Sequence, residues 1–163
     1  MSFLDDPLWH KLRDFPLDDP ESNLPFTRRL ARDNAWQLAY ALAVVEEYRR
    51  FLYLAKVAGH VVTPSDEVDQ AWHLHLVYTR SYWDELCGEV LGEPLHHGPT
   101  RGGKPEQAKY NDLYARTLES YRRVFDETPR EDVWPTARDR FVIDAVRVRR
   151  RDFWLIAKPW RRR

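Results

Sequence analysis

The sequence predicts an all-α protein, a single-domain bundle of about four to five helices. Over long stretches, apolar residues recur at intervals of three and four, which is the spacing of one face of a helix. Prolines and glycines separate these stretches, and no alternating pattern of convincing length predicts a strand. At 163 residues, 43% hydrophobic and 13% aromatic, the chain is long and apolar enough to form one core.

The first 26 residues are expected to be irregular. Four prolines interrupt an acidic stretch: Pro7, Pro16, Pro20 and Pro25. Proline removes a backbone donor and restricts the chain, so helical turns there should be short at most. Apolar side chains such as Trp9 and Leu12 favour packing of this segment across the domain. We therefore expect an irregular segment, residues 1–26, that packs on a helical domain of residues 27–135.

Periodicity predicts three long helices and a helical tail. The first covers residues 27–58, and the second runs from an N-cap at Thr63 to about residue 87 or 91. A loop rich in glycine and proline then precedes the third helix, residues 105–125. The tail from residue 136 to about residue 152 is expected to be helical too.

Four of the six histidines fall within residues 64–103, the stretch that also holds the single cysteine. It contains V-D-Q-A-W-H-L-H at residues 68–75 and H-H-G-P at residues 96–99. Carboxylate, imidazole and thiol groups this close in a sequence can bind a metal ion or transfer protons. The candidate site residues are Asp69, Trp72, His73, His75, Cys87, His96 and His97.

Helical geometry divides these candidates between two faces. Asp69 and His73 are four residues apart and share a face, which Leu76, Arg80, Trp83 and Cys87 would continue. His75 lies about 200° around the helix from His73, so the two cannot bind one ion unless the helix is distorted. His75 instead falls on a stripe expected to face the core, with Val68, Trp72, Thr79, Tyr82 and Leu86.

Two interpretations of the cluster stay open. In one, Asp69, His73 and His97 bind zinc, or iron with open positions for a substrate, and His75 or His96 replaces one of them. In the other, the same groups form a buried hydrogen-bond network in which His96 or His97 bonds to Asp69 and holds the loop. We favour the network, because no second acidic cluster, phosphate loop or nucleophile–base pair accompanies the histidines. Metal-free acid–base chemistry is the least favoured, and Cys87 is interpreted as a buried residue rather than a nucleophile.

The C-terminal segment, residues 136–163, is basic. Residues 138–163 carry ten Lys or Arg against three Asp, a net charge of +7, which leaves −7 on residues 1–137. Arginines beside tryptophans suit single-stranded nucleic acid or an anionic membrane surface, although we favour a protein contact or docking on the acidic body. The arginines concerned are Arg147, Arg149, Arg150, Arg151, Arg161, Arg162 and Arg163.

Composition and the N-terminal residues predict a cytoplasmic protein. One cysteine forms no internal disulfide, and the first residues lack the basic start and apolar run of a signal peptide. No stretch approaches the roughly 18 apolar residues that predict a membrane span. The expected partner is therefore a protein, with nucleic acid as a less favoured alternative.

Five sequence segments together form a recognisable pattern: E-Y-R-R-F-L-Y-L-A at 47–55, T-P-S-D-E-V-D-Q-A-W-H-L-H at 63–75, Y-T-R-S-Y-W at 78–83, Cys87, and L-G-E-P-L-H-H-G-P at 91–99. With them, the chain resembles the glycine-rich domain-containing protein-like family of bacteria and plants. The similarity to bacterial members continues to V-W-P at residues 133–135 and covers about residues 36–135 in all. It leaves out the first thirty residues and the tail.

The resemblance implies signature positions rather than a reaction. These positions are Asp69, Trp72, His73, His75, Cys87, His97 and Pro99. Plant members join such a domain to a glycine-rich segment and are linked to stress responses and RNA, but this chain has only six glycines and no such segment. We therefore expect a helical interaction or accessory module, with a divalent-metal-binding protein or metal-dependent enzyme as the alternative.

Overall fold

The computed structural model describes residues 2–98 and 104–140, without the side chains of residues 104–109. Within these ranges the chain forms six α-helices, one π-helix and one 3-10 turn, and it contains no strand. The elements are η1 (Phe3–Asp5), α1 (Pro7–Asp14), α2 (Phe26–Asn34), α3 (Leu38–Val57), α4 (Asp66–Val77), η2 (Arg80–Leu91), α5 (Lys104–Phe125) and α6 (Ala137–Arg140). The all-α prediction is confirmed, but there are more helices than the four to five expected.

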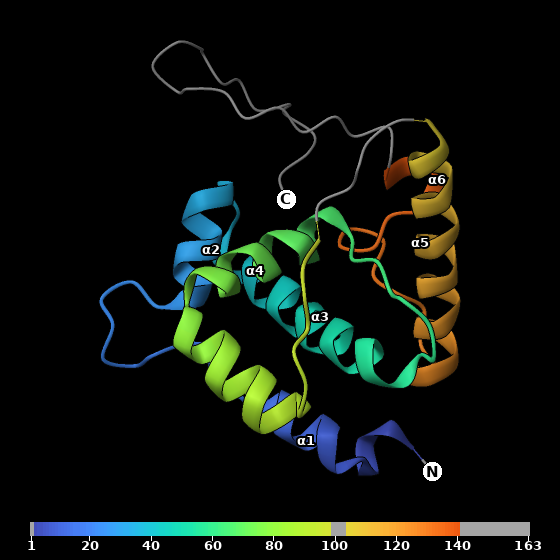
Figure 1. The fold of residues 1–163 in the computed structure, drawn as a ribbon. Coiled ribbons are helices and arrows are strands. Elements are labelled where there is room, and N and C mark those ends of the chain that lie inside the picture. The colour runs from blue at the N-terminus through green and yellow to red at the C-terminus, as the bar shows by residue number, and fades with distance from the viewer. Residues whose placement is uncertain (1, 99–103, 141–163) are drawn as a thin grey trace, which may run out of the picture.

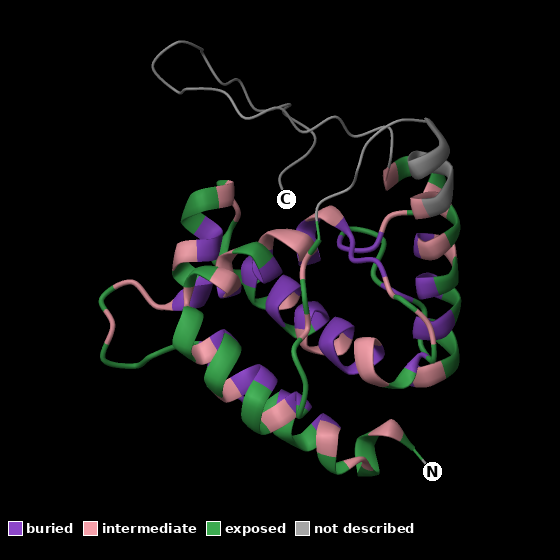
Figure 2. Cartoon of the chain, in the orientation of Figure 1, coloured by how far each residue is buried: buried purple, intermediate pink, exposed green. Residues whose placement is uncertain are grey.

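Helix α3 is the centre of the fold, and α1, α2, α4 and α5 all pack against it (Figure 1). Its inward residues are fully covered: Val44, Tyr48, Phe51 and Leu54 have no measurable exposure. Figure 2 shows the buried residues concentrated on α3 and on the inner faces of its neighbours. Because four helices surround α3, apolar residues lie on most sides of this helix.

The predicted helix of residues 27–58 is wrong as a single helix, because the chain turns at Ala35. Ala35 has a left-handed backbone, with φ of 55°, and its N–H donates to the Ala31 carbonyl. The N–H of Trp36 donates to the same carbonyl at 2.8 Å. A left-handed residue at the end of a helix is usually glycine. Because this position holds alanine, the sequence did not indicate that the helix ends here.

The predicted second helix is also two, and its break lies at Tyr78. Helix α4 begins after Ser65, whose Oγ accepts the Val68 N–H at 3.2 Å, so Ser65 rather than Thr63 is the N-cap. At Tyr78 the backbone leaves the helical region, and its ring packs on Phe26 of α2 at 5.6 Å between centroids. The chain then continues as the π-helix η2, which turns more slowly per residue than an α-helix. Residues on either side of Tyr78 therefore do not share the faces that one continuous helix predicts.

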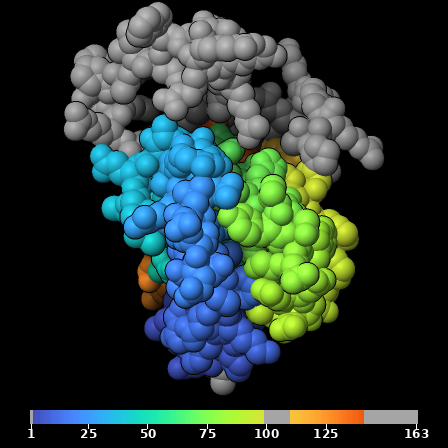
Figure 3. Space-filling view, turned by 90° about the vertical axis from the view of Figure 1, so that its left-hand side faces the viewer, coloured from blue at the N-terminus to red at the C-terminus, as the bar shows by residue number. Residues whose placement is uncertain are grey.

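The N-terminal segment is more helical than expected. Helix α1 has eight residues, with Pro7 in its first turn and the Asp6 carboxylate accepting the Leu8 N–H at 2.8 Å. Trp9 and Leu12 of α1 are buried in the core. In Figure 3 the N-terminal residues, in blue, cover the middle of one face, with the green residues of η2 beside them.

Most of the basic tail lies outside the described residues. Helix α6 is its only described element, and the seven arginines proposed for an anionic partner lie beyond residue 140, outside the described residues. Among the helices within residues 2–98 and 104–140, none combines the length and the apolar character needed to cross a membrane.

Candidate metal centre

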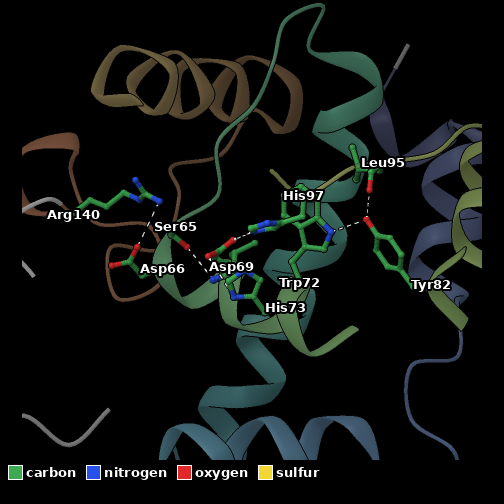
Figure 4. Close-up of polar contacts among 10 residues, drawn as sticks. Ser65, Asp66, Asp69, Trp72, His73, Tyr82, Leu95, His97 and Arg140 are labelled. Atoms are coloured by element: carbon green, nitrogen blue, oxygen red, sulfur yellow. Dashed lines mark hydrogen bonds and ion pairs between the residues drawn. The ribbon is translucent and has the colours of Figure 1, made fainter. Parts of the chain in front are cut away.

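Three of the candidate residues come together at the surface of α4. Asp69 and His73 lie one turn apart on α4, and His97 lies on the segment that follows η2 (Figure 4). One ligand-type atom from each lies within 4.8 Å of the other two. We call Asp69, His73 and His97 the triad.

The Asp69 carboxylate is the centre of the triad. Its Oδ1 lies 2.7 Å from Nε2 of His97, a hydrogen bond, and its Oδ2 lies 3.8 Å from Nδ1 of His73. The two imidazole rings are tilted against each other with 4.3 Å between their centroids. One carboxylate thus has an imidazole nitrogen close to each of its oxygens.

These separations are close to those of a metal site. At bond lengths of about 2.0–2.1 Å, neighbouring ligand atoms around zinc or iron lie roughly 3.0–3.4 Å apart. The carboxylate–imidazole distances of 2.7 and 3.8 Å fall on either side of that range. To reach this range His73 must approach Asp69, and the Asp69 and His97 atoms must separate by a few tenths of an ångström. The side chain of His73 is 46% exposed, so it has room to rotate.

The triad is half open to water. The side chains of Asp69 and His97 are 24% and 18% exposed, so an ion held by them would be partly covered. His73 also lines a cavity between α2 and α4. The cluster is therefore neither sealed in the core nor wholly at the surface.

Two hydrogen bonds connect Trp72 and Tyr82 with the segment that carries His97. The indole Nε1 of Trp72 donates to the Tyr82 hydroxyl at 2.7 Å, and that hydroxyl donates to the Leu95 carbonyl at 2.5 Å. Burial raises the pKa of Tyr82, so the hydroxyl keeps the proton that it donates. The edge of Trp72 also meets the His97 ring, with 4.5 Å between centroids. Together these contacts connect α4, η2 and the segment that carries His97.

The first turn of α4 places a second acid beside the triad. Asp66 pairs with Arg140 of α6 at 3.5 Å. Burial raises the pKa of Asp66, and Arg140 opposes this shift while the Asp69 charge adds to it. Acidic residues in a first turn also interact favourably with the positive end of the helix dipole. Arg140 thus neutralises Asp66 and leaves Asp69 to the two imidazoles (Figure 4).

His75 lies in the core, as its position on the stripe predicts, and not at the triad. Its Nδ1 is 3.0 Å from the Tyr48 hydroxyl and its Nε2 is 3.2 Å from Ser81 Oγ, and the residue is 1% exposed. Burial, with a smaller contribution from the charge of Arg49, lowers the pKa of His75 to about 4. His75 is therefore a neutral core residue that uses both ring nitrogens for hydrogen bonds.

The other candidates also lie apart from the triad. Cys87 is buried in the core and forms no disulfide, so the face that Asp69 begins does not continue to it. His96 is exposed and contacts the ring of Trp83, with 5.6 Å between centroids. Adjacent residues of an extended segment point to opposite sides, which separates His96 from His97.

Sequence reasoning missed how the triad is supported. Tyr82 was placed on the core-facing stripe, but nothing in the sequence connects its hydroxyl with the Leu95 carbonyl thirteen residues later. The cavity beside His73 was missed as well, because its second wall comes from α2. The i, i+4 spacing that identified Asp69 and His73 predicts only contacts within one helix, so it cannot predict a contact with another helix.

Comparison with known proteins finds two relatives in a plant. Two glycine-rich domain-containing proteins of Arabidopsis thaliana, numbered 1 and 2, are each 24% identical to it over 106 residues, or 62% of this chain. The similarity to glycine-rich domain-containing proteins expected from the sequence is thereby confirmed. The aligned part is only 13% of each plant protein, and no solved structure matches the chain.

The matched region contains the whole triad and the helices that support it. The family described as UCP032817-like matches residues 25–144, from the start of α2 to beyond α6. Since this match covers well over half of the sequence, the chain belongs to the UCP032817-like family.

Proposed function

We propose that this protein binds a divalent metal ion, zinc or iron(II), through Asp69, His73 and His97. One carboxylate and two imidazoles form a donor set that suits both ions. The observation that carries the proposal is the approach of three ligand-type atoms to within 4.8 Å of one another, from two separate segments of the chain.

The openness of the triad favours a metal centre over a structural network. A network that only stabilises the fold gains most when its groups are sealed and fully bonded. Here His73 is 46% exposed, and its nearest carboxylate oxygen is 3.8 Å away, too far for a hydrogen bond. A structural network explains the bond between Asp69 and His97 but gives His73 no role.

Three protein ligands leave at least one coordination position for water or a small molecule. A metal ion held in this way can polarise a bound oxygen or lower the pKa of a bound water, so the proposal includes a metal-dependent enzyme. The contribution of the chain is to hold the ligands. Asp69 holds His97 through a hydrogen bond, and the Trp72 ring contacts the ring of His97.

The interaction module favoured by the sequence is the second candidate function. Leu38 and Leu42 lie one turn apart on α3 and are 43% and 50% exposed. Apolar side chains exposed together on one helix are suited to contact with another protein. This function needs no metal, so a metal measurement separates the two candidates.

The first test is elemental analysis of protein purified without chelator and without a histidine tag. The wild type should carry about one zinc or iron ion per chain, as a three-ligand site predicts. His97→Ala and His73→Ala should lose the ion while keeping the helical circular dichroism of the wild type.

His96→Ala is the matched control, because His96 is the exposed neighbour of His97 and lies outside the triad. It should keep its metal. If the wild type stays metal-free after dialysis against zinc, iron and manganese, or if His97→Ala binds as much metal as His96→Ala, the metal centre is disproved. The search would then turn to protein partners.

A further inference from the structure

A cavity of about 430 Å³ lies between α2 and α4, and the triad and this cavity share one residue, His73. Its walls are Leu30, Asp33 and Asn34 from α2 and Gln70, His73, Leu74 and Val77 from α4. On each helix these residues recur at intervals of three and four, so each wall is one continuous helical face. His73 stands at the boundary, one turn from Asp69 and on the same face as Leu74 and Val77.

The lining combines three aliphatic side chains with four polar ones. Leu30, Leu74 and Val77 are aliphatic, and the amide of Gln70 lies on the same wall as His73. Asp33 pairs with Arg32 at 2.8 Å, so it adds little net charge to the cavity. The volume lies within the range of sites for small organic molecules.

The charge of the metal centre determines which head group would bind there. A divalent ion held by one carboxylate and two neutral imidazoles has a net charge of about +1, and the ion dominates the local field. Such a centre attracts an anionic oxygen ligand. The aliphatic wall beside it is suited to a hydrocarbon chain attached to that ligand.

We propose that this cavity is the ligand pocket of the metal centre and that it takes a small monocarboxylate with an apolar body. The carboxylate occupies the open coordination position beside His73, and the Gln70 amide donates to its second oxygen. The apolar body lies along Leu30, Leu74 and Val77. This inference rests on the proposed metal function and adds to it the class of ligand.

The experiment uses the full chain loaded with cobalt(II), whose visible absorption changes when a ligand enters the coordination sphere. Acetate and hexanoate are titrated separately. They have the same head group, so only the longer one can use the aliphatic wall. Hexanoate should bind at least about tenfold more tightly, because each buried methylene adds to the transfer free energy.

Val77→Trp is designed to block the cavity, because Val77 lines it and is 74% exposed, so a larger side chain can be accommodated without disturbing the core. Val61→Trp is the matched control, since Val61 is 72% exposed and lies outside the cavity. Val77→Trp should take up cobalt as the wild type does and lose the preference for hexanoate over acetate. Val61→Trp should keep that preference.

The outcomes separate this inference from the proposed function. If the protein takes up no cobalt, the metal centre and the pocket both fail. If cobalt binds but hexanoate has no advantage over acetate, or if Val61→Trp and Val77→Trp behave alike, the metal centre stands and the pocket is overturned.

Discussion

His73 and His75 are two residues apart on α4 and lie in opposite surroundings. His75 is 1% exposed, is surrounded by the rings of Phe15, Phe26, Tyr48 and Tyr82, and bonds through both ring nitrogens. His73 is 46% exposed and lies near the Asp69 carboxylate and the His97 ring.

The surroundings of His73 and His75 show that the role of a histidine in a motif that resembles a metal-binding one depends on its position on the helix. Burial without a charged partner keeps His75 neutral and bonded, which makes it part of the core. Exposure beside a carboxylate is what the proposed metal-binding role of His73 requires. A W-H-x-H motif thus contains one structural and one candidate ligand histidine, and each variant below tests that division.

The largest expected effect is on stability. His75→Ala removes a core ring and leaves the hydroxyls of Tyr48 and Ser81 without that partner, which should cost about 3 kcal/mol in the free energy of unfolding. His73→Ala, at an exposed position, should cost less than about 0.5 kcal/mol. Urea unfolding of the metal-free protein measures both. Equal losses would remove the distinction between the two histidines.

The next effect is on the pH dependence of stability. Burial lowers the pKa of His75 to about 4 in the folded protein, whereas a histidine in an unfolded chain has a pKa of about 6.5, so the unfolded chain takes up the proton first as the pH falls. Stability from this residue is therefore complete above about pH 6.5 and is lost towards pH 4, with about 2 kcal/mol lost between pH 7 and pH 5. Unfolding of the metal-free protein at several pH values measures the loss. His75→Gln, which does not titrate, should lose less, and an identical profile would contradict the prediction.

The smallest effect concerns Tyr82, which connects the two regions because its ring contacts His75 and its hydroxyl holds Leu95 near His97. Tyr82→Phe should cost about 1 kcal/mol in stability and weaken metal binding about tenfold. Tyr114→Phe is the control, because Tyr114 is equally buried and donates to the Pro135 carbonyl at 2.9 Å, not to the segment that carries His97. It should lose similar stability and bind metal normally. Equal metal affinity in the two variants, measured by competition with a chromophoric chelator, would show that Tyr82 does not position His97.

Local spacing in the sequence was enough to predict the all-α class, the third helix and the division of Asp69 and His73 from His75. These follow from the geometry of a single helix, which depends only on neighbouring residues. The same reasoning joined α2 to α3 and α4 to η2, because Ala35 and Tyr78 are residues that normally continue a helix. Their turns are stabilised by contacts that the sequence does not display, such as the packing of Tyr78 on Phe26.

The sequence favoured His97 as the ligand beside Asp69 but left His96 open as its partner, and the tertiary structure brings His97 to Asp69. The hydrogen bond from Tyr82 to Leu95 orients the segment so that His97 faces α4 and His96 faces Trp83. The cavity beside His73 likewise exists only because α2 packs against α4. The sequence by itself thus determined which residues share one face of a helix, because that depends on backbone geometry. Which faces and loops meet depended on packing between segments far apart in the chain.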